Sequence, residues 1–131
     1  MFDKVTESPM AVYRRFLERG ELAYQYSVDA RAAIFYPRLV CPISGTDRLE
    51  WRVSDGFGTV HAVTVVHGQD RRHNVVLVDL DDGFRLLSRV EGVDPDRVRI
   101  GMRVKVRIQR PEASAGDQAP YPVFDLLPVA P

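Results

Sequence analysis

The sequence predicts a mainly β protein with an N-terminal helix. Only one segment, close to the N-terminus, has apolar residues at helical spacing together with start and stop signals. From Gly56 onward, short β-branched runs alternate with turn residues, which is typical of a small barrel or sandwich. The length of 131 residues fits one domain, or one small domain with an appendage. It excludes an eight-stranded α/β barrel, which needs ~250 residues.

The predicted helix begins after Ser8, the expected N-cap, has Pro9 at its first position, and ends before Gly20. Its apolar residues recur at helical spacing and form one stripe, made of Met10, Tyr13, Phe16 and Leu17. This stripe packs either on the chain's own domain or on a partner protein, and the sequence favours neither.

Residues 21–51 lack a regular period. Half of the twelve aromatic residues lie between Tyr13 and Tyr36, and prolines follow at positions 37 and 42. Because proline disfavours a helix around it, this segment is expected to be extended chain and turns.

Four or five short strands are expected after Gly56. A hairpin turn is predicted at Asp81-Asp82-Gly83, a second turn through residues 94–96, and a linker around residues 114–117. The fourth run alternates apolar and basic residues, so it predicts a half-buried strand with one cationic face. The predicted strands cover residues 59–66, 75–78, 84–90, 102–108 and 123–127.

The charge balance does not favour a nucleic-acid binder. The 18 basic and 18 acidic side chains cancel, whereas non-specific affinity for phosphate needs an excess of cations. One run of cations contains no acidic residue: Arg97, Arg99, Arg103, Lys105, Arg107 and Arg110. This basic run either contacts the phosphates of a nucleotide or of RNA, or forms the solvated face of an edge strand. The few aromatic residues on the predicted barrel favour the solvated face, because single-strand binding needs stacking rings.

The sequence predicts a cytoplasmic protein with no membrane contact. A single cysteine cannot form an internal disulfide, and the charged, proline-containing N-terminus is unlike a secretory signal. No apolar run approaches the ~20 residues of a membrane span.

Signals for independent catalysis are weak. The sequence has no G-x-S-x-G elbow and no glycine-rich phosphate loop, and the glycines of Gly56-Phe57-Gly58 indicate a bend into a strand. His61, His67 and His73 are six residues apart, which is ~20 Å along a strand, so one strand cannot bring them to a common metal. Any chemistry is therefore expected to come from a partner.

Several short motifs resemble, in their order and spacing, the rubredoxin-like zinc-ribbon and OB-fold proteins of domain-of-unknown-function family thirty-five. The resemblance covers roughly residues 20–127. The motifs are Gly20, Leu22, Gln25, Pro37-Arg38, Cys41-Pro42, Leu49-Glu50-Trp51, Gly58-Thr59-Val60, Thr64-Val65-Val66-His67, Val78-Asp79-Leu80-Asp81-Asp82-Gly83, Arg85-Leu86-Leu87-Ser88 and Val98-Arg99-Ile100-Gly101-Met102-Arg103-Val104.

The resemblance implies an OB-type small barrel preceded by a degenerate zinc-ribbon-like segment. The expected domains are residues 1–54, with the helix and the ribbon-like segment, and residues 55–131, with the OB-fold. Because the family accompanies thiolases and other acyl-CoA enzymes, it implies a non-catalytic accessory subunit of a hetero-oligomer. The implied partner is a thiolase-like, acyltransferase or hydratase subunit, and the chain would help it to bind or present a CoA thioester. An OB-fold module for single-stranded nucleic acid is the alternative.

The family's zinc-ligand positions are degenerate in this sequence. They are occupied by Ser27, Ala30, Cys41 and Ser44, so three of the four cysteines are missing. Structural zinc needs four thiolate or imidazole ligands, and even Asp29 as a substitute would leave the set incomplete. We therefore expect no zinc and no tightly bound cofactor.

Candidate contacts for a CoA thioester are cations near an aromatic residue. They are Tyr36 with Arg38, and Arg71 with Arg72 near the end of the first barrel strand. A further alternative, an enzyme that acts on acyl thioesters through Cys41, is disfavoured because no histidine lies close to Cys41 in the sequence.

Overall fold

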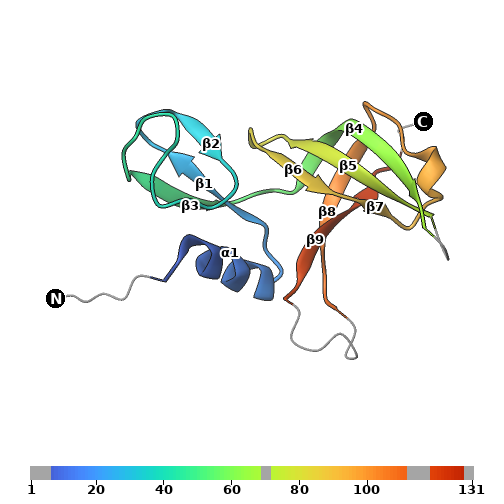
Figure 1. The fold of residues 1–131 in the computed structure, drawn as a ribbon, viewed down its shortest axis with the longest axis horizontal. Helices are drawn as coiled ribbons and strands as arrows, with labels where there is room; N and C mark the ends of the chain where they lie inside the picture. Colours follow the sequence, from blue (N-terminus) through green and yellow to red (C-terminus); the bar gives the residue numbers. More distant parts are fainter. Residues whose placement is uncertain (1–6, 69–71, 112–118, 129–131) are drawn as a thin grey trace.

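The computed structural model describes residues 7–68, 72–111 and 119–128. In this part of the chain, helix α1 (Pro9–Glu18) is followed by a small three-stranded sheet and a larger six-stranded sheet (Figure 1). The small sheet contains β1 (Ala23–Ser27), β2 (Ala32–Ile34) and β3 (Leu49–Val53). The large sheet contains β4 (Phe57–His67), β5 (Arg72–Leu80), β6 (Arg85–Ser88), β7 (Val90–Glu91), β8 (Arg103–Gln109) and β9 (Tyr121–Leu126), with a 3-10 turn η1 (Pro95–Arg97) between β7 and β8. The predicted mainly β fold with an N-terminal helix is confirmed.

Helix α1 has the predicted start and end. The Ser8 hydroxyl accepts a hydrogen bond from Ala11 N at 3.2 Å, and Gly20 follows the helix with a φ of +79°. Tyr13 and Leu17 are buried and belong to the hydrophobic core. The apolar stripe therefore packs on the chain itself, although Met10 at its edge stays partly exposed. None of the helical segments in the described ranges is long and apolar enough to cross a membrane.

Residues 21–51 contain the expected extended chain and turns, but the loss of periodicity gave no sign that the extended parts pair into the small sheet. Its strand order is β2-β1-β3, and both pairings are antiparallel. Four of the five residues of β1 are buried, so its two faces do not alternate between apolar and polar residues. Without that alternation, the period that identifies a half-buried strand is missing.

The large sheet has the order β6-β5-β4-β8-β9-β7. The predicted hairpin is confirmed: β5 and β6 are antiparallel on either side of the turn, where Gly83 has a φ of +107°. The strand predicted at residues 84–90 is divided into β6 and β7, which gives six strands where five were expected. The division occurs because the side-chain amide of Asn74 binds the backbone of Val90. Its Oδ1 accepts from Val90 N at 2.8 Å, and its Nδ2 donates to Val90 O at 3.0 Å. Val90 then pairs in parallel with Phe124 on β9.

The predicted bend at Gly56-Phe57-Gly58 leads into β4. Gly56 has a φ of +85°, and a Cβ atom there would lie 2.5 Å from Val106 Cγ1. A Cβ atom on Gly58 would lie 2.8 Å from the carbonyl oxygen of Asp79. Both positions therefore require glycine. The predicted linker at residues 114–117 lies outside the described residues.

Aromatic rings join the two sheets. Phe84, just after the β5–β6 turn, stacks on Tyr24 of β1 at 4.8 Å and on Phe35 at 4.9 Å between ring centroids. Phe35 also meets Tyr13 of α1 edge-on at 5.5 Å. We call these four rings the aromatic bridge. It connects the helix, the small sheet and the barrel hairpin in one continuous core. The division into domains at residue 54 stays a prediction.

Candidate functional site: a groove between the helix and the large sheet

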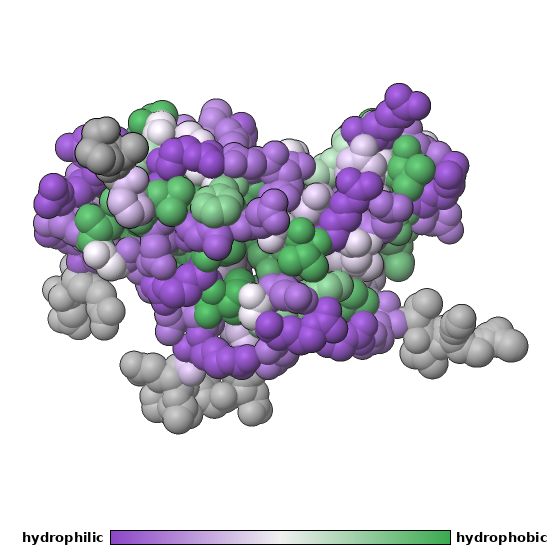
Figure 2. Space-filling view, turned by 180° about the vertical axis from the view of Figure 1, so that it is seen from behind, coloured by the Kyte–Doolittle hydropathy of each residue, from purple (hydrophilic) through white to green (hydrophobic). Residues whose placement is uncertain are grey.

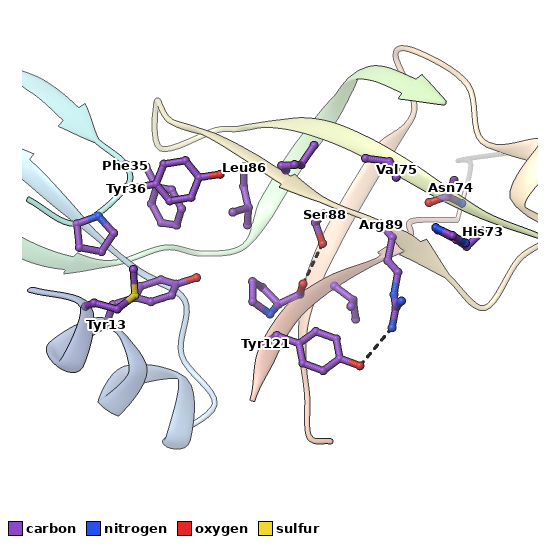
Figure 3. A pocket seen from close by; sticks show the side chains of 15 residues that line it. Tyr13, Phe35, Tyr36, His73, Asn74, Val75, Leu86, Ser88, Arg89 and Tyr121 are labelled. Atoms are coloured by element: carbon purple, nitrogen blue, oxygen red, sulfur yellow. Dashed lines mark hydrogen bonds between the residues drawn. The ribbon is translucent and has the colours of Figure 1, made fainter. Parts of the chain in front are cut away.

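A groove of about 460 Å³ opens where α1, the segment after β2 and the large sheet meet (Figure 3). Such a volume is within the range of ligand pockets, ~300–1,000 Å³. Figure 2 shows that apolar side chains also reach the surface in the middle of the face that it displays. The residues that line the groove are Met10, Tyr13, Phe35, Tyr36, Pro37, His73, Asn74, Val75, Leu86, Leu87, Ser88, Arg89, Tyr121, Pro122 and Val123.

One wall of the groove is aromatic. Phe35 and Tyr36 follow β2, and their ring centroids are 5.3 Å apart. Tyr36 is 55% exposed, so its ring is available to a ligand or partner. Burial is the larger cause, and the charge of a nearby Tyr36 phenolate the smaller one, of a rise in the pKa of Tyr13 to about 12. The Tyr13 hydroxyl therefore stays protonated at neutral pH and cannot serve as a base.

The opposite side of the groove carries its polar groups. The Arg89 guanidinium donates a hydrogen bond to the Tyr121 hydroxyl at 3.2 Å, and its Cζ lies 5.6 Å from the centroid of that ring (Figure 3). Arg89 Nε is 2.6 Å from Glu91 Oε2. Ser88 donates to the carbonyl oxygen of Pro122 at 2.9 Å, which fixes the distance between β6 and β9 at this point. The groove thus offers apolar walls and the guanidinium group of Arg89, which Tyr121 and Glu91 hold in place. This arrangement is suited to binding a ligand.

The structure describes three of the four predicted CoA contacts, and it places them in different surroundings. Tyr36 lines the groove, whereas Arg38 is exposed just beyond Pro37. The backbone of Arg38 is held by Gln25, which accepts from its N at 2.6 Å and donates to its O at 2.8 Å. Among the described residues, no carboxylate pairs with the Arg38 side chain. Arg72 binds Asp94 and Asp96, and Arg71 lies outside the described residues.

The four zinc-ligand positions lie in two turns, one after β1 and one before β3. Cys41 is 1% exposed, and its Sγ accepts hydrogen bonds from Ile43 N at 3.4 Å and Ser44 N at 3.3 Å. Burial raises the pKa of the Cys41 thiol, whereas hydrogen bonds from Ser27, from Ser44 and from these two backbone groups lower it. The lowering outweighs the effect of burial, and the resulting pKa is about 7. A donor set of one thiol, two hydroxyls and the methyl group of Ala30 does not fit structural zinc. Within the described residues, the hydrogen bonds to the buried thiol come from Ile43 N and Ser44 N, and not from a histidine.

Most members of the basic run have partners. Arg103 forms a two-pronged ion pair with Asp81 at 2.7 and 2.8 Å, and Arg107 binds Asp125 and Glu91. The run therefore presents less positive charge than its sequence indicates. The remaining contacts are those of Arg110 with Glu18, Lys105 with the Phe57 ring and Arg99 with the carbonyl oxygen of Asp96.

The histidines are divided between two strands, with His61 and His67 on β4 and His73 on β5. His61 Nδ1 is 3.2 Å from Asp79 Oδ2, and His73 lines the groove. Within residues 7–68, 72–111 and 119–128, no group of three His, Cys, Asp or Glu residues is placed to hold a metal ion.

Sequence reasoning missed Arg89, Tyr121 and the part that Tyr13 takes in the groove. No short motif connects these residues, because they come from α1, from the link between β6 and β7, and from β9.

Comparisons with known proteins show a family model that matches part of the chain. Residues 51–109 match the family model described as "ChsH2, C-terminal OB-fold domain". Over 62 residues, the chain is 39% identical to the alpha subunit of 3-oxo-4,17-pregnadiene-20-carboxyl-CoA hydratase from Mycobacterium tuberculosis, strain H37Rv. That match covers 44% of this chain and 20% of the hydratase subunit, so the chain spans about a fifth of the length of this curated relative.

Two solved structures have the same fold. A chain of the "Ltp2-ChsH2(DUF35) aldolase" superposes with a TM-score of 0.78 at 22% identity, over 95% of this chain and 98% of that one. A DUF35-family protein of unknown function from Sulfolobus solfataricus superposes with a TM-score of 0.60 at 14% identity, over 79% and 80% of the two chains. The resemblance predicted from the sequence motifs is confirmed: residues 51–109 match the model of the ChsH2 C-terminal OB-fold domain, and the chain has the fold of two DUF35 structures.

Proposed function

We propose that this chain is a non-catalytic accessory subunit that binds an acyl-CoA enzyme and helps it to hold the CoA thioester. The observation that carries the proposal is the combined match: an OB-fold domain of the ChsH2 type, and a fold that superposes over 95% of the chain on a subunit of an aldolase complex. The named relatives are a CoA-ester hydratase subunit and that aldolase. The partner proposed here is a thiolase-like, acyltransferase or hydratase subunit.

The surface around the groove supports a protein partner. Leu87, on the edge strand β6, is 53% exposed, and Tyr36 on the opposite wall is equally exposed. Beyond Arg38, Leu39 before the second turn and Ile43 within it are 72% and 68% exposed. Because exposed large apolar side chains commonly mark an interaction site, we place the partner at the groove, which Leu87 and Tyr36 line.

The CoA thioester is proposed to contact the chain at Tyr36 and Arg38. Tyr36 offers an aromatic face for an apolar part of the ligand. The CoA phosphates need cations, and Arg38 has no carboxylate partner among the described residues, whereas Arg72 already has two. Of the arginines first considered, Arg38 is therefore favoured over Arg72.

The nucleic-acid alternative is less well supported. Arg103 and Arg107, at the centre of the basic run, are paired with carboxylates at 2.7 to 3.2 Å, so contact with phosphate would first have to break these pairs. A phosphate-binding groove instead relies on unpaired cations and stacking rings.

Affinity purification of the tagged chain from extracts of its source organism tests the proposal. Recovery of a stoichiometric acyl-CoA enzyme, followed by reconstitution of the complex from purified subunits, would support it. Recovery of the chain alone, or with RNA, would overturn it.

Two substitutions, each of which places an aspartate at an exposed apolar position, test whether the partner binds at the groove. Leu87→Asp should abolish binding of the partner, because it places a charge at the edge of the groove. Ile100→Asp is the matched control, because Ile100 is 69% exposed and lines a separate hollow with Met102 and Leu127. Equal binding by both variants would exclude the groove as the interface.

Arginine substitutions test the CoA contact in the reconstituted complex. Arg38→Ala should weaken the affinity for a CoA thioester about tenfold, the loss expected for one charge-assisted contact. Arg72→Ala should leave it unchanged. An Arg38→Ala complex with full affinity would remove Arg38 as a ligand contact and leave the subunit assignment intact.

A further inference from the structure

The two turns at Ser27–Arg31 and Cys41–Gly45 share a backbone hydrogen bond and a positive φ at the fifth residue. In each, the carbonyl oxygen of the first residue accepts a hydrogen bond from the fifth: Arg31 N to Ser27 O at 2.8 Å, and Gly45 N to Cys41 O at 2.9 Å. The fifth residue has a positive φ in both turns, +55° for Arg31 and +77° for Gly45. A positive φ is uncommon for a residue other than glycine, so its repetition at Arg31 marks one turn geometry used twice.

The first side chain of each turn makes the same contact within its turn. Ser27 Oγ accepts a hydrogen bond from Ala30 N at 3.1 Å, and Cys41 Sγ accepts one from Ser44 N at 3.3 Å. Both side chains are buried, at 0% and 1% exposure. The two turns also lie next to each other, because Ser27 of the first turn is close enough to Cys41 of the second to lower the pKa of its thiol.

Two adjacent turns, each with candidate ligands at its first and fourth residues, have the ligand spacing of a four-thiolate zinc site. Here the four positions hold Ser27, Ala30, Cys41 and Ser44, and the methyl group of Ala30 cannot be a ligand. The backbone therefore has the arrangement of a metal site, whereas the side chains do not.

Contacts outside the four positions connect the turns. Asp29, inside the first turn, accepts hydrogen bonds from Thr46 Oγ1 at 2.6 Å and from the Arg48 guanidinium at 2.7 Å. Val28 N donates to the carbonyl oxygen of Arg48 at 3.0 Å. These contacts close the loop between the turns, which a shared metal ion would otherwise close.

We infer that the two turns form a metal-free knuckle pair, in which hydrogen bonds to Cys41 Sγ and the Asp29 contacts hold the geometry that a zinc ion would impose. Two consequences follow. The native chain needs no metal to fold, and its backbone is arranged so that restoring the missing thiols creates a metal site.

The first test uses the unmodified chain, purified from zinc-supplemented cells and dialysed. Metal analysis should find substoichiometric zinc, and EDTA should leave the melting temperature unchanged. Stoichiometric zinc, or a fall in melting temperature with EDTA, would overturn the inference.

The second test restores the ligands with the triple variant S27C/A30C/S44C. The reduced variant should bind one Co²⁺ per chain, with the absorption bands of tetrahedral thiolate coordination, and zinc should raise its melting temperature. The control S27C/S44C, which lacks the fourth thiol, should bind Co²⁺ more weakly. A folded triple variant that binds no metal would show that the turns do not converge as inferred.

A single substitution tests the role of Cys41 without any metal. Cys41→Ala removes the acceptor of two backbone N–H groups, so it should lower the melting temperature by roughly 5 °C or more. Thr64→Ala, on an exposed position of β4, is the control and should change it little. An unchanged melting temperature in Cys41→Ala would exclude Cys41 as the centre of the pair.

Discussion

Replacement of Phe84 by alanine tests whether the aromatic bridge holds the two sheets together. The Phe84 side chain is 6% exposed and stacks on Tyr24 and Phe35 with centroid distances of 4.8 and 4.9 Å. A buried Phe→Ala change costs about 3–5 kcal/mol. Because the variant loses two stacked pairs, each worth about 0.5–1.5 kcal/mol beyond area burial, we expect the free energy of unfolding to fall by the upper part of that range.

The corresponding fall in melting temperature is roughly 10–20 °C for a chain of this size. Scanning calorimetry measures it, and limited proteolysis between Tyr24 and Trp51 should become faster as the small sheet separates from the hairpin. Leu87→Ala is the control on the same hairpin, where exposure limits the loss to about 1 kcal/mol or less. If Phe84→Ala lost no more stability than Leu87→Ala, the bridge would not be what joins the sheets.

Three further predictions concern the large sheet. Asn74→Asp should lower the free energy of unfolding by about 1–3 kcal/mol in urea titration, because aspartate cannot donate to the carbonyl oxygen of Val90. An unchanged free energy would show that the hydrogen bonds between Asn74 and Val90 do not stabilise the fold. Gly58→Ala should destabilise the chain or prevent folding, since its Cβ would clash with the neighbouring strand, and a melting temperature at or above that of the parent would refute this. The hydrogen bond and charge of Arg103 hold the pKa of Asp81 below its ordinary 3.8, so the pair stabilises the fold above that pH and the contribution is lost as the pH falls through the lower folded value. Arg103→Met should reduce this acid-induced loss in a pH series of thermal melts, and an unchanged pH dependence would exclude the pair as its source.

Local signals predicted the elements that are defined by local interactions. Ser8, Pro9 and Gly20 act within one or two turns of chain, and they mark the ends of α1 correctly. The turn at Gly83 is also local, and the hairpin follows from it. By contrast, β1 is buried on both faces by contacts with distant segments, so no alternation marks it.

The division between β6 and β7 could not be predicted for the same reason. It depends on Asn74, a residue of β5 whose amide groups bind the backbone of Val90 across the sheet. In the sequence, the residues around Val90 continue the pattern of a single strand. Only the fold brings Asn74 to the position where the strand must end.

The candidate site was predicted only at Tyr36 and, next to it, Arg38. These two residues share one short segment, so a motif can bring them to notice. Arg89 and Tyr121 lie 32 positions apart, and they meet because β9 runs beside the chain that leaves β6. The basic run shows the opposite error: the sequence displays its cations, while the carboxylates that pair with them come from other strands.

The position of the groove connects stability with assembly. Tyr13 and Phe35 belong both to the aromatic bridge and to the groove wall, so a ligand or partner that fills the groove presses on the same rings that join the two sheets. Anything that binds the folded chain and not the unfolded one raises its stability. If the proposed partner occupies the groove, it should therefore raise the melting temperature of a bridge variant such as Phe84→Ala as well as that of the parent chain. A partner that binds at Ile100 instead would add stability without protecting the segment between Tyr24 and Trp51 from proteolysis, so protection of this segment distinguishes the two surfaces.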